Sequence, residues 1–265
     1  MRNCARWLWI CLSLAGILAG CTTTQTTKTI SPAADNSQVQ ANDSKRAAIR
    51  LQLAIDYFQQ DQLATALKEL NNALSIDPNL SQAYSVRALV YMQMQENDLA
   101  EQDFQKATRL TPNSSDNDVN YGWFLCQTGR EKQGIELFDR VIKDRMYAQP
   151  TKALNNAGIC SLKLKDATAA ESYFMQSVRL DASNPTTNLN LAGINYRRHD
   201  YPRAQFYIDR VIKADSYSAE ILWLAIRINH RLGDQGSVVA LSAQLHKRFP
   251  DSDEDALSQR GAYDE

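Results

Sequence analysis

The residue types that most often do chemistry are scattered in this sequence and form no catalytic pattern. Its three histidines, His199, His230 and His246, have no spacing suited to shared metal ligation. The sequence contains no HExxH, CxxC or GxSxG motif and no glycine-rich phosphate loop. Carboxylates such as Glu101 and Asp103 fall on expected outer helix faces, where we expect them to be solvated. We therefore predict a protein that is not an enzyme, with no catalytic residue, metal, cofactor or small-molecule substrate.

The N-terminus has the pattern of an export signal that ends in a lipid-attachment site. Arg2 and Arg6 precede a short apolar run, and the run ends in Leu-Ala-Gly-Cys at residues 18–21. This ending resembles a lipobox, the motif whose cysteine is diacylated before the signal is removed. We expect residues 1–20 to be a lipoprotein signal peptide and Cys21 to carry the lipid anchor.

The residue after the lipidated cysteine indicates the membrane. Position 22 is threonine. In this the sequence resembles the bacterial lipoproteins that lack aspartate after the lipidated cysteine, which are usually passed to the outer membrane. We expect a lipid-anchored protein on the periplasmic face of the outer membrane, with inner-membrane retention as the alternative. Loss of residues 1–20 takes the formal net charge from −1 to about −3, and this absence of basic excess argues against nucleic acid as a partner.

Residues 21–46 are rich in threonine, glutamine, serine and asparagine and poor in large apolar side chains. Such a segment buries too little apolar surface to offset the entropy lost on ordering. We predict a flexible tether, which would typically span about 25–30 Å.

From residue 47 onward the sequence repeats every 34 residues. Small residues recur in a first predicted helix and early in a second, and a bulky residue follows on the second helix. The first-helix positions are Ala54, Ala88, Gly122, Gly158 and Ala192, and the second-helix positions are Ala66, Ala100, Gly134, Ala170 and Ala204. Small residues at these places let two helices approach closely, so the pattern predicts a chain of helix pairs.

The pattern resembles the tetratricopeptide repeat. It implies an all-α, right-handed superhelical solenoid of six helix-turn-helix repeats, expected at residues 47–80, 81–114, 115–148, 151–184, 185–218 and 219–252. Two extra residues precede Thr151, and the sixth unit departs from the pattern at Ile226 and Val238. Residues 253–265 are expected to form a polar C-terminal tail.

The first helices of such a solenoid line a groove in which partners bind. Positions that avoid the packing stripe give an apolar end, with Leu51, Ile55, Phe58, Leu89 and Met92, then Trp123, and an aromatic and basic end with Tyr196, Arg197, Trp223 and Arg231. The apolar end suits an amphipathic or apolar segment, and the basic end suits an acidic segment. Each of these residues could instead pack against its neighbours.

Three stretches in the third and fourth units are more specific than a general repeat. They are Asn-Tyr-Gly-Trp-Phe-Leu-Cys at 120–126, Met-Tyr-Ala-Gln-Pro at 146–150 and Gly-Ile-Cys-Ser at 158–161. These resemble the PilF/PilW family of type IV pilus biogenesis lipoproteins, described as pilotins. The resemblance implies an outer-membrane scaffold that binds the pilus secretin and promotes its localisation and multimerisation. The alternative is a repeat lipoprotein adaptor for outer-membrane protein insertion or cell-wall synthesis.

Cys126 and Cys160 are the two cysteines left after the signal and the lipidated residue are set aside. They fall near the ends of the first helices of two neighbouring units. The two extra residues offset them within their repeats, so spacing leaves open whether their Cα atoms come within the roughly 4.4–6.8 Å that a disulfide requires. The family resemblance favours the bond, and two small buried thiols are the alternative.

Overall fold

The computed structural model describes residues 32–215 and 217–264. The chain divides into two compact units, residues 1–41 and residues 42–265, and the helix pairs described below belong to the second, apart from residues 32–41 of α1. The predicted signal peptide and the predicted lipidation site at Cys21 lie outside the described residues. Throughout residues 32–215 and 217–264, no helix is both long enough and apolar enough to cross a membrane.

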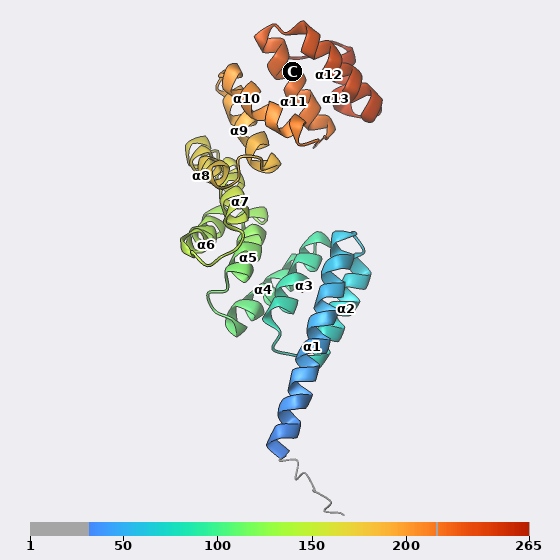
Figure 1. The fold of residues 1–265 in the computed structure, drawn as a ribbon, viewed down its shortest axis with the longest axis vertical. Coiled ribbons are helices and arrows are strands. Elements are labelled where there is room, and N and C mark those ends of the chain that lie inside the picture. Colours follow the sequence, from blue (N-terminus) through green and yellow to red (C-terminus); the bar gives the residue numbers. More distant parts are fainter. Residues whose placement is uncertain (1–31, 216, 265) are drawn as a thin grey trace, which may run out of the picture. The chain divides into compact units, whose positions relative to one another are not determined.

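Helices follow one another in antiparallel pairs, and each predicted 34-residue unit contains one pair (Figure 1). The pairs are α1 (Pro32–Gln59) with α2 (Leu63–Ile76), α3 (Ser81–Gln93) with α4 (Asn97–Leu110), α5 (Ser115–Gln127) with α6 (Glu131–Lys143), α7 (Pro150–Lys163) with α8 (Ala167–Leu180), α9 (Pro185–Arg197) with α10 (Tyr201–Lys213), and α11 (Ala219–Leu232) with α12 (Gln235–Arg248). A shorter helix, α13 (Asp253–Gln259), follows the last pair. The predicted all-α fold is confirmed.

The turn between the two helices of each pair contains one residue in the left-handed backbone region. These residues are Asp61, Gln95, Gly129, Lys165, His199 and Gly233, with φ between 59° and 81°. They recur every 34 residues, except that 36 residues separate Gly129 from Lys165, where the two extra residues lie. A left-handed residue ends a helix by letting the chain reverse tightly, so the sequence period is also a period of backbone geometry.

Capping side chains start several of the helices. Asp166, Asp200 and Asp234 each accept a hydrogen bond from the backbone N–H three residues ahead, at 2.9, 3.2 and 3.0 Å. Such caps satisfy N–H groups that have no partner within the helix. Pro150 and Pro185 occupy the first turns of α7 and α9, where proline is tolerated because its missing N–H would be unpaired anyway.

The small residues of the repeat lie where paired helices touch. A Cβ atom added to Gly134 would lie 2.5 Å from the backbone oxygen of Gly122, and one added to Gly158 would lie 2.6 Å from the ring of Phe174. The corresponding alanines in the other pairs are fully buried. The close approach that the sequence pattern predicts is therefore present in the structure.

The predicted flexible tether over residues 21–46 is wrong for residues 32–46, which belong to α1. This helix begins at Pro32, and no glycine or proline interrupts the sequence from there to Gln59. From residue 40 onward, the first buried residue of α1 is Ala47. Once the part of α1 from Ala47 onward is formed, the helix lengthens by one hydrogen bond per residue without a new nucleus. Low apolar content therefore did not prevent helix formation here.

The predicted polar tail over residues 253–265 is also wrong for much of its length. Residues 253–259 form α13, and Ser252 caps it by accepting a hydrogen bond from the N–H of Asp255 at 3.1 Å. The Asp255 carboxylate is buried, lies 2.9 Å from Nδ1 of His246 in α12, and accepts a 2.7 Å hydrogen bond from Gln259. Leu257 of α13 also packs against the core that contains Val238 and Leu245, so both polar and apolar contacts hold this helix against α12.

Candidate functional site

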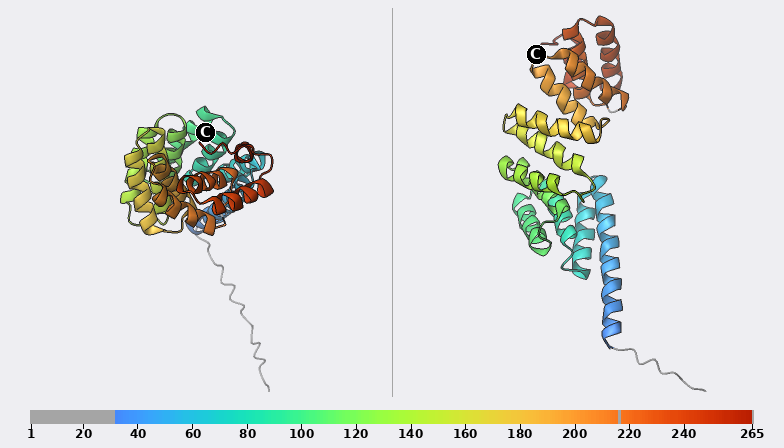
Figure 2. Two further views of the ribbon diagram at one scale, coloured as in Figure 1. Left: turned by 90° about the horizontal axis from the view of Figure 1, so that it is seen from above. Right: turned by 60° about the vertical axis from the view of Figure 1, so that its left-hand side comes forward.

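The first helices of successive pairs contact one another along one face of residues 42–264. α3 contacts α5, α5 contacts α7, α7 contacts α9 and α9 contacts α11. Figure 2 shows the helix pairs from α5 onward following one another in chain order. Side chains on this face that are not used in helix pairing are available to a partner.

The apolar end of this face contains a pocket of about 470 Å³, which we call the near pocket. Its residues come from four successive first helices, α1, α3, α5 and α7. They are Phe58, Leu89, Met92, Gln93, Asn120, Trp123, Lys152 and Asn156. An apolar floor with a few polar groups at its edge is typical of a binding pocket. Four of the predicted groove residues, Phe58, Leu89, Met92 and Trp123, thus lie together.

Two predicted groove residues of α1 do not line the near pocket. Leu51 is 5% exposed and packs in the core of the first helix pair, so its prediction as a binding residue is wrong. Leu53, two residues later on α1, is 38% exposed. Ile55 is half-buried against the same core. The packing stripe of α1 runs through Ala47, Leu51 and Ala54, at i, i+4 and i+7, which places Leu53 outside it.

The aromatic and basic end of the face is not an open groove. Trp223 of α11 is only 8% exposed, and its ring lies 5.9 Å from the ring of Tyr263. The Arg231 guanidinium forms a 2.7 Å ion pair with Asp264. The chain's own segment after α13 therefore covers predicted binding residues that we expected to face solvent.

Two other predicted residues at this end differ in exposure. Arg197 is exposed, and Tyr196 is half-buried, with the Arg227 guanidinium 5.0 Å from its ring centroid. Hydrogen bonding to Tyr196 and, to a lesser extent, the charge of Asp264 raise the pKa of Arg231.

The carboxylates that we expected to be solvated are held by arginines. Asp103 is 7% exposed and accepts hydrogen bonds from Nε and Nη2 of Arg87 at 2.6 and 2.9 Å, while Nη1 of Arg87 donates to Asn71 at 2.7 Å. Glu101 accepts a 2.6 Å hydrogen bond from Arg130, which lowers the pKa of that carboxyl. The prediction for Asp103 is wrong because Arg87 reaches it from the neighbouring helix. Both pairs tie helices together.

The residues that the structure describes contain no group of three or more histidine, cysteine, aspartate or glutamate side chains arranged to hold a metal ion. The histidines are used singly. His199 Nδ1 lies 2.8 Å from the hydroxyl of Tyr201, and His246 contacts Asp255 as described above.

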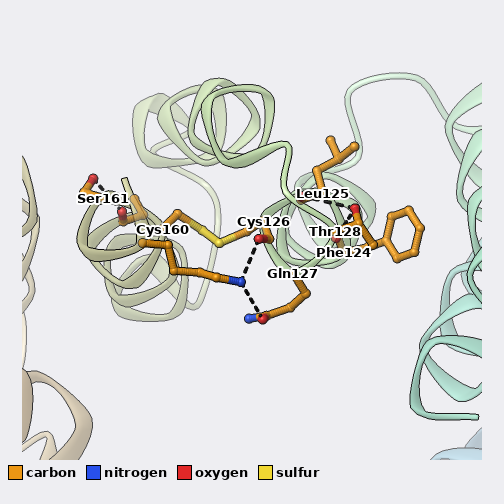
Figure 3. Close-up of a disulfide and its surroundings, with 9 residues drawn as sticks. Phe124, Leu125, Cys126, Gln127, Thr128, Cys160 and Ser161 are labelled. Atoms are coloured by element: carbon orange, nitrogen blue, oxygen red, sulfur yellow. Dashed lines mark hydrogen bonds between the residues drawn. A yellow bond between two sulfur atoms is a disulfide. The ribbon is translucent and has the colours of Figure 1, made fainter. Parts of the chain in front are cut away.

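A disulfide joins Cys126 of α5 to Cys160 of α7 (Figure 3). The two Cα atoms are 5.7 Å apart, within the range that spacing alone left open, and both side chains are fully buried. Lys163 also links these helices, because its Nζ donates to the Cys126 carbonyl and to the Gln127 side chain, each at 3.0 Å. The inner helices of two successive pairs are therefore fastened covalently.

The chain matches the family described as tetratricopeptide repeat over residues 81–114 and 151–184, which are the predicted second and fourth units, and a related TPR repeat family over residues 56–95. The crystal structure of PilW, a "widely conserved type IV pilus biogenesis factor", matches with 30% identity and a TM-score of 0.72, covering 80% of this chain and 98% of PilW. This chain belongs to the PilF/PilW-like family of tetratricopeptide-repeat proteins. The predicted repeat fold and family resemblance are confirmed.

Another PilF/PilW-like protein shows the same relationship. The type IV pilus assembly protein PilF of Pseudomonas aeruginosa is 28% identical over 202 residues, covering 76% of this chain and 80% of PilF. The structure of Pseudomonas aeruginosa PilF matches with 26% identity and a TM-score of 0.74, over 83% of this chain and 99% of that one. The likeness to the PilF/PilW-like family thus extends over most of the chain.

The polar part of the near pocket was missed by sequence reasoning. Asn120 lies one helical turn before Trp123, so the helical period could have placed both on one face of α5. Lys152 and Asn156 lie one turn apart near the start of α7, and the same rule applies to them. Tyr263 carried no such signal, because its contact with this PilF/PilW-like fold depends on how the chain returns after α13.

Proposed function

We propose that this chain is a lipid-anchored scaffold of type IV pilus assembly in the outer membrane. In this role it binds the pilus secretin and promotes its localisation and multimerisation, and it acts as a binding protein rather than as an enzyme. Support comes from the relatives named above, which are described as a type IV pilus assembly protein and a pilus biogenesis factor. The tetratricopeptide repeat is a fold that presents extended surfaces to protein partners.

The observation that carries the binding role is the near pocket. It collects half-buried apolar side chains from consecutive helix pairs, where Leu89 and Met92 of α3 lie beside Trp123 of α5. Apolar side chains grouped on one surface and left partly exposed usually mark a binding site. A volume of about 470 Å³ is suited to a few apolar side chains of one peptide segment.

The polar residues at the edge of the near pocket indicate the chemical character of the segment that binds there. Lys152 is exposed and supplies a positive charge, and Asn120 and Asn156 supply amide groups. We propose that the secretin segment is amphipathic, with two or three apolar side chains facing Met92 and Trp123 and an acidic side chain near Lys152. Amphipathic helices and extended peptides bind in grooves in this way.

Anchoring through Cys21 completes the proposal. A single acyl chain holds a protein only marginally, so the several chains of a lipoprotein are needed for stable attachment. The near pocket includes Phe58 of α1, which belongs to the repeat that follows Cys21 most closely in sequence. A Cys21→Ser protein should therefore be lost from the outer membrane, and cell fractionation measures this. Quantitative retention of Cys21→Ser in the outer membrane would mean that another feature anchors the chain.

Two methionines of one segment allow a matched test of the near pocket. Met92 lines the pocket, whereas Met94, two residues later, is 41% exposed outside it. We expect Met92→Asp to weaken secretin binding by about thirty-fold, or about 2 kcal/mol, as for a residue central to an interface. Met94→Asp should bind like the wild type. The measurement is secretin capture by lipidated protein from outer membranes, together with the amount of secretin multimer in cells.

A stability control separates binding from folding. Phe58→Ala tests the pocket from α1, and circular dichroism melting shows whether any variant has lost structure. The proposal fails if Met92→Asp and Phe58→Ala melt normally and still support wild-type secretin multimers. Surface pili and secretin multimers that persist in a strain lacking this protein would reject the pilus role itself.

A further inference from the structure

The segment that follows α13 turns back across the inner face of α11. The ring of Tyr263 lies 4.6 Å from the ring of His230 and 5.9 Å from that of Trp223, measured between centroids. The backbone carbonyl of Tyr263 accepts a 3.1 Å hydrogen bond from Nε of Arg227. One residue later, Asp264 pairs with Arg231. An aromatic ring, a backbone carbonyl and a carboxylate are thus each recognised by a separate group.

The recognising groups form one continuous surface, which we call the far surface. Trp223, Arg227, His230 and Arg231 occur at i, i+4, i+7 and i+8 of α11 and so share a helix face. Tyr196 of α9 adjoins them, since the Arg227 guanidinium lies between its ring, at 5.0 Å, and that of Trp223, at 5.9 Å. Cationic groups flanked by aromatic rings favour aromatic and acidic ligands.

The far surface also retains binding capacity that the segment does not use. Within the described residues, Nδ1 of His230 is buried and has no hydrogen-bond partner. A buried polar atom without a partner is destabilising, and a ligand that supplies one would remove this cost. The far surface is therefore only partly satisfied by Tyr263 and Asp264.

The contacts of the chain's own segment are of a kind that a competitor can replace. Asp264 is 66% exposed in its ion pair with Arg231, and exposed ion pairs contribute little to stability. Tyr263 is half-buried rather than enclosed. The segment is attached close by, however, and a short linker gives it an effective concentration in the millimolar range. The segment therefore occupies the far surface because of its high effective concentration rather than because of a high intrinsic affinity.

We propose that the far surface is a second peptide-binding site. Its ligand is a partner segment in which an aromatic residue is followed by an acidic one, and Tyr263 and Asp264 occupy the site until that segment replaces them. This inference goes beyond the proposed function, because the far surface shares no residue with the near pocket and its test needs no pilus protein.

Peptide binding in trans tests this directly. The probe is a fluorescein-labelled peptide of residues 259–265, and the protein is the full mature chain. We expect the Tyr263→Ala, Asp264→Ala double variant to bind the probe about ten-fold or more tightly than the wild type, because its own segment no longer competes. Fluorescence anisotropy measures the affinity, and a scrambled probe should bind neither protein.

A matched charge reversal identifies the surface. In the double-variant background, Arg231→Glu should weaken probe binding about ten-fold or more, whereas Arg203→Glu should not. Arg203 is a suitable control because it is 60% exposed on α10. If the two charge reversals weaken probe binding equally, the probe is held by general charge attraction, and the proposal is overturned. The proposal is equally overturned if the double variant binds the probe no better than the wild type.

A second measurement does not depend on the probe. In a Trp123→Phe background, Trp223 is the one tryptophan left after residues 1–20 are removed, so excitation at the red edge of the tryptophan band reports on it selectively. We expect acrylamide to quench Trp223 more strongly in the double variant, since the Tyr263 ring no longer covers it. Unchanged quenching, with unchanged circular dichroism, would show that the segment does not protect the far surface and would overturn the proposal.

Discussion

Breaking the disulfide between Cys126 and Cys160 should destabilise the middle of the repeat array by about 4 kcal/mol. The bond closes a loop with a sequence separation of 34. For a loop of this length, the entropy removed from the unfolded chain corresponds to about 4 kcal/mol at 25 °C. Alanine in place of each fully buried cysteine adds a smaller packing loss.

Hydrogen exchange is the suitable assay, because a repeat protein can open in one part while the rest remains folded. Removal of about 4 kcal/mol lowers the protection of amides in α5–α8 by about a thousand-fold. Amides in α11 and α12 should change little, since they lie in a later part of the array. Reductant should have the same effect on the wild type and none on the Cys126→Ala, Cys160→Ala double variant.

Non-additivity provides the decisive comparison. Cys126→Ala and Cys160→Ala each break the same bond, so either single variant should lose nearly as much stability as the double variant. Single losses that add to the double loss would show that the cysteines act as separate packing residues. The reasoning is also refuted if thiol labelling of denatured, unreduced protein detects both thiols free.

Two further predictions concern packing between helices. Arg87→Met should destabilise the protein by about 3–5 kcal/mol, because it leaves the buried Asp103 carboxylate unpaired, and adding Asp103→Leu should recover most of the loss. Urea denaturation of the wild type and the two variants measures this, and a double variant as unstable as Arg87→Met would contradict it. Gly158→Ala should destabilise the protein by about 1–3 kcal/mol, because the added methyl group overpacks against the Phe174 ring. Gly193→Ala is the control and should be neutral or stabilising, since its added Cβ meets no atom closer than 3.5 Å. Equal melting temperatures for these two variants would show that the Phe174 ring moves aside freely.

The helix pairs could be predicted from sequence because their cause is local and repeated. Two helices that pack closely need small residues at fixed positions, as at Gly122 and Gly134, and the 34-residue period repeats this requirement. Leu51, which we predicted in the groove and which packs in the core, shows the limit of the method. Leu51 lies one turn before Ala54, and the packing stripe and the groove stripe adjoin on a helix, so the pattern alone could not decide which of the two contains Leu51.

The two ends of the inner face were predictable to different degrees. The near pocket follows from helix periodicity, because its residues lie on helices with a regular register. Tyr263 instead reaches the far surface from a polar segment with no period of its own. Its position depends on α13, which is too short to show a helical stripe and is held by the buried Asp255 carboxylate and by the single apolar residue Leu257. Contacts of that kind depend on the complete tertiary fold.

The disulfide joins two of the four helices that line the near pocket, α5 and α7, and this sets the near pocket apart from the far surface. Trp123 precedes Cys126 by one turn on α5, and Asn156 precedes Cys160 by one turn on α7. The covalent bond therefore fixes the separation of two helices whose side chains must face the same ligand. A pocket with fixed walls loses little ordering entropy on binding. The far surface is covered by a displaceable segment, so it can respond to a ligand by exchanging one occupant for another.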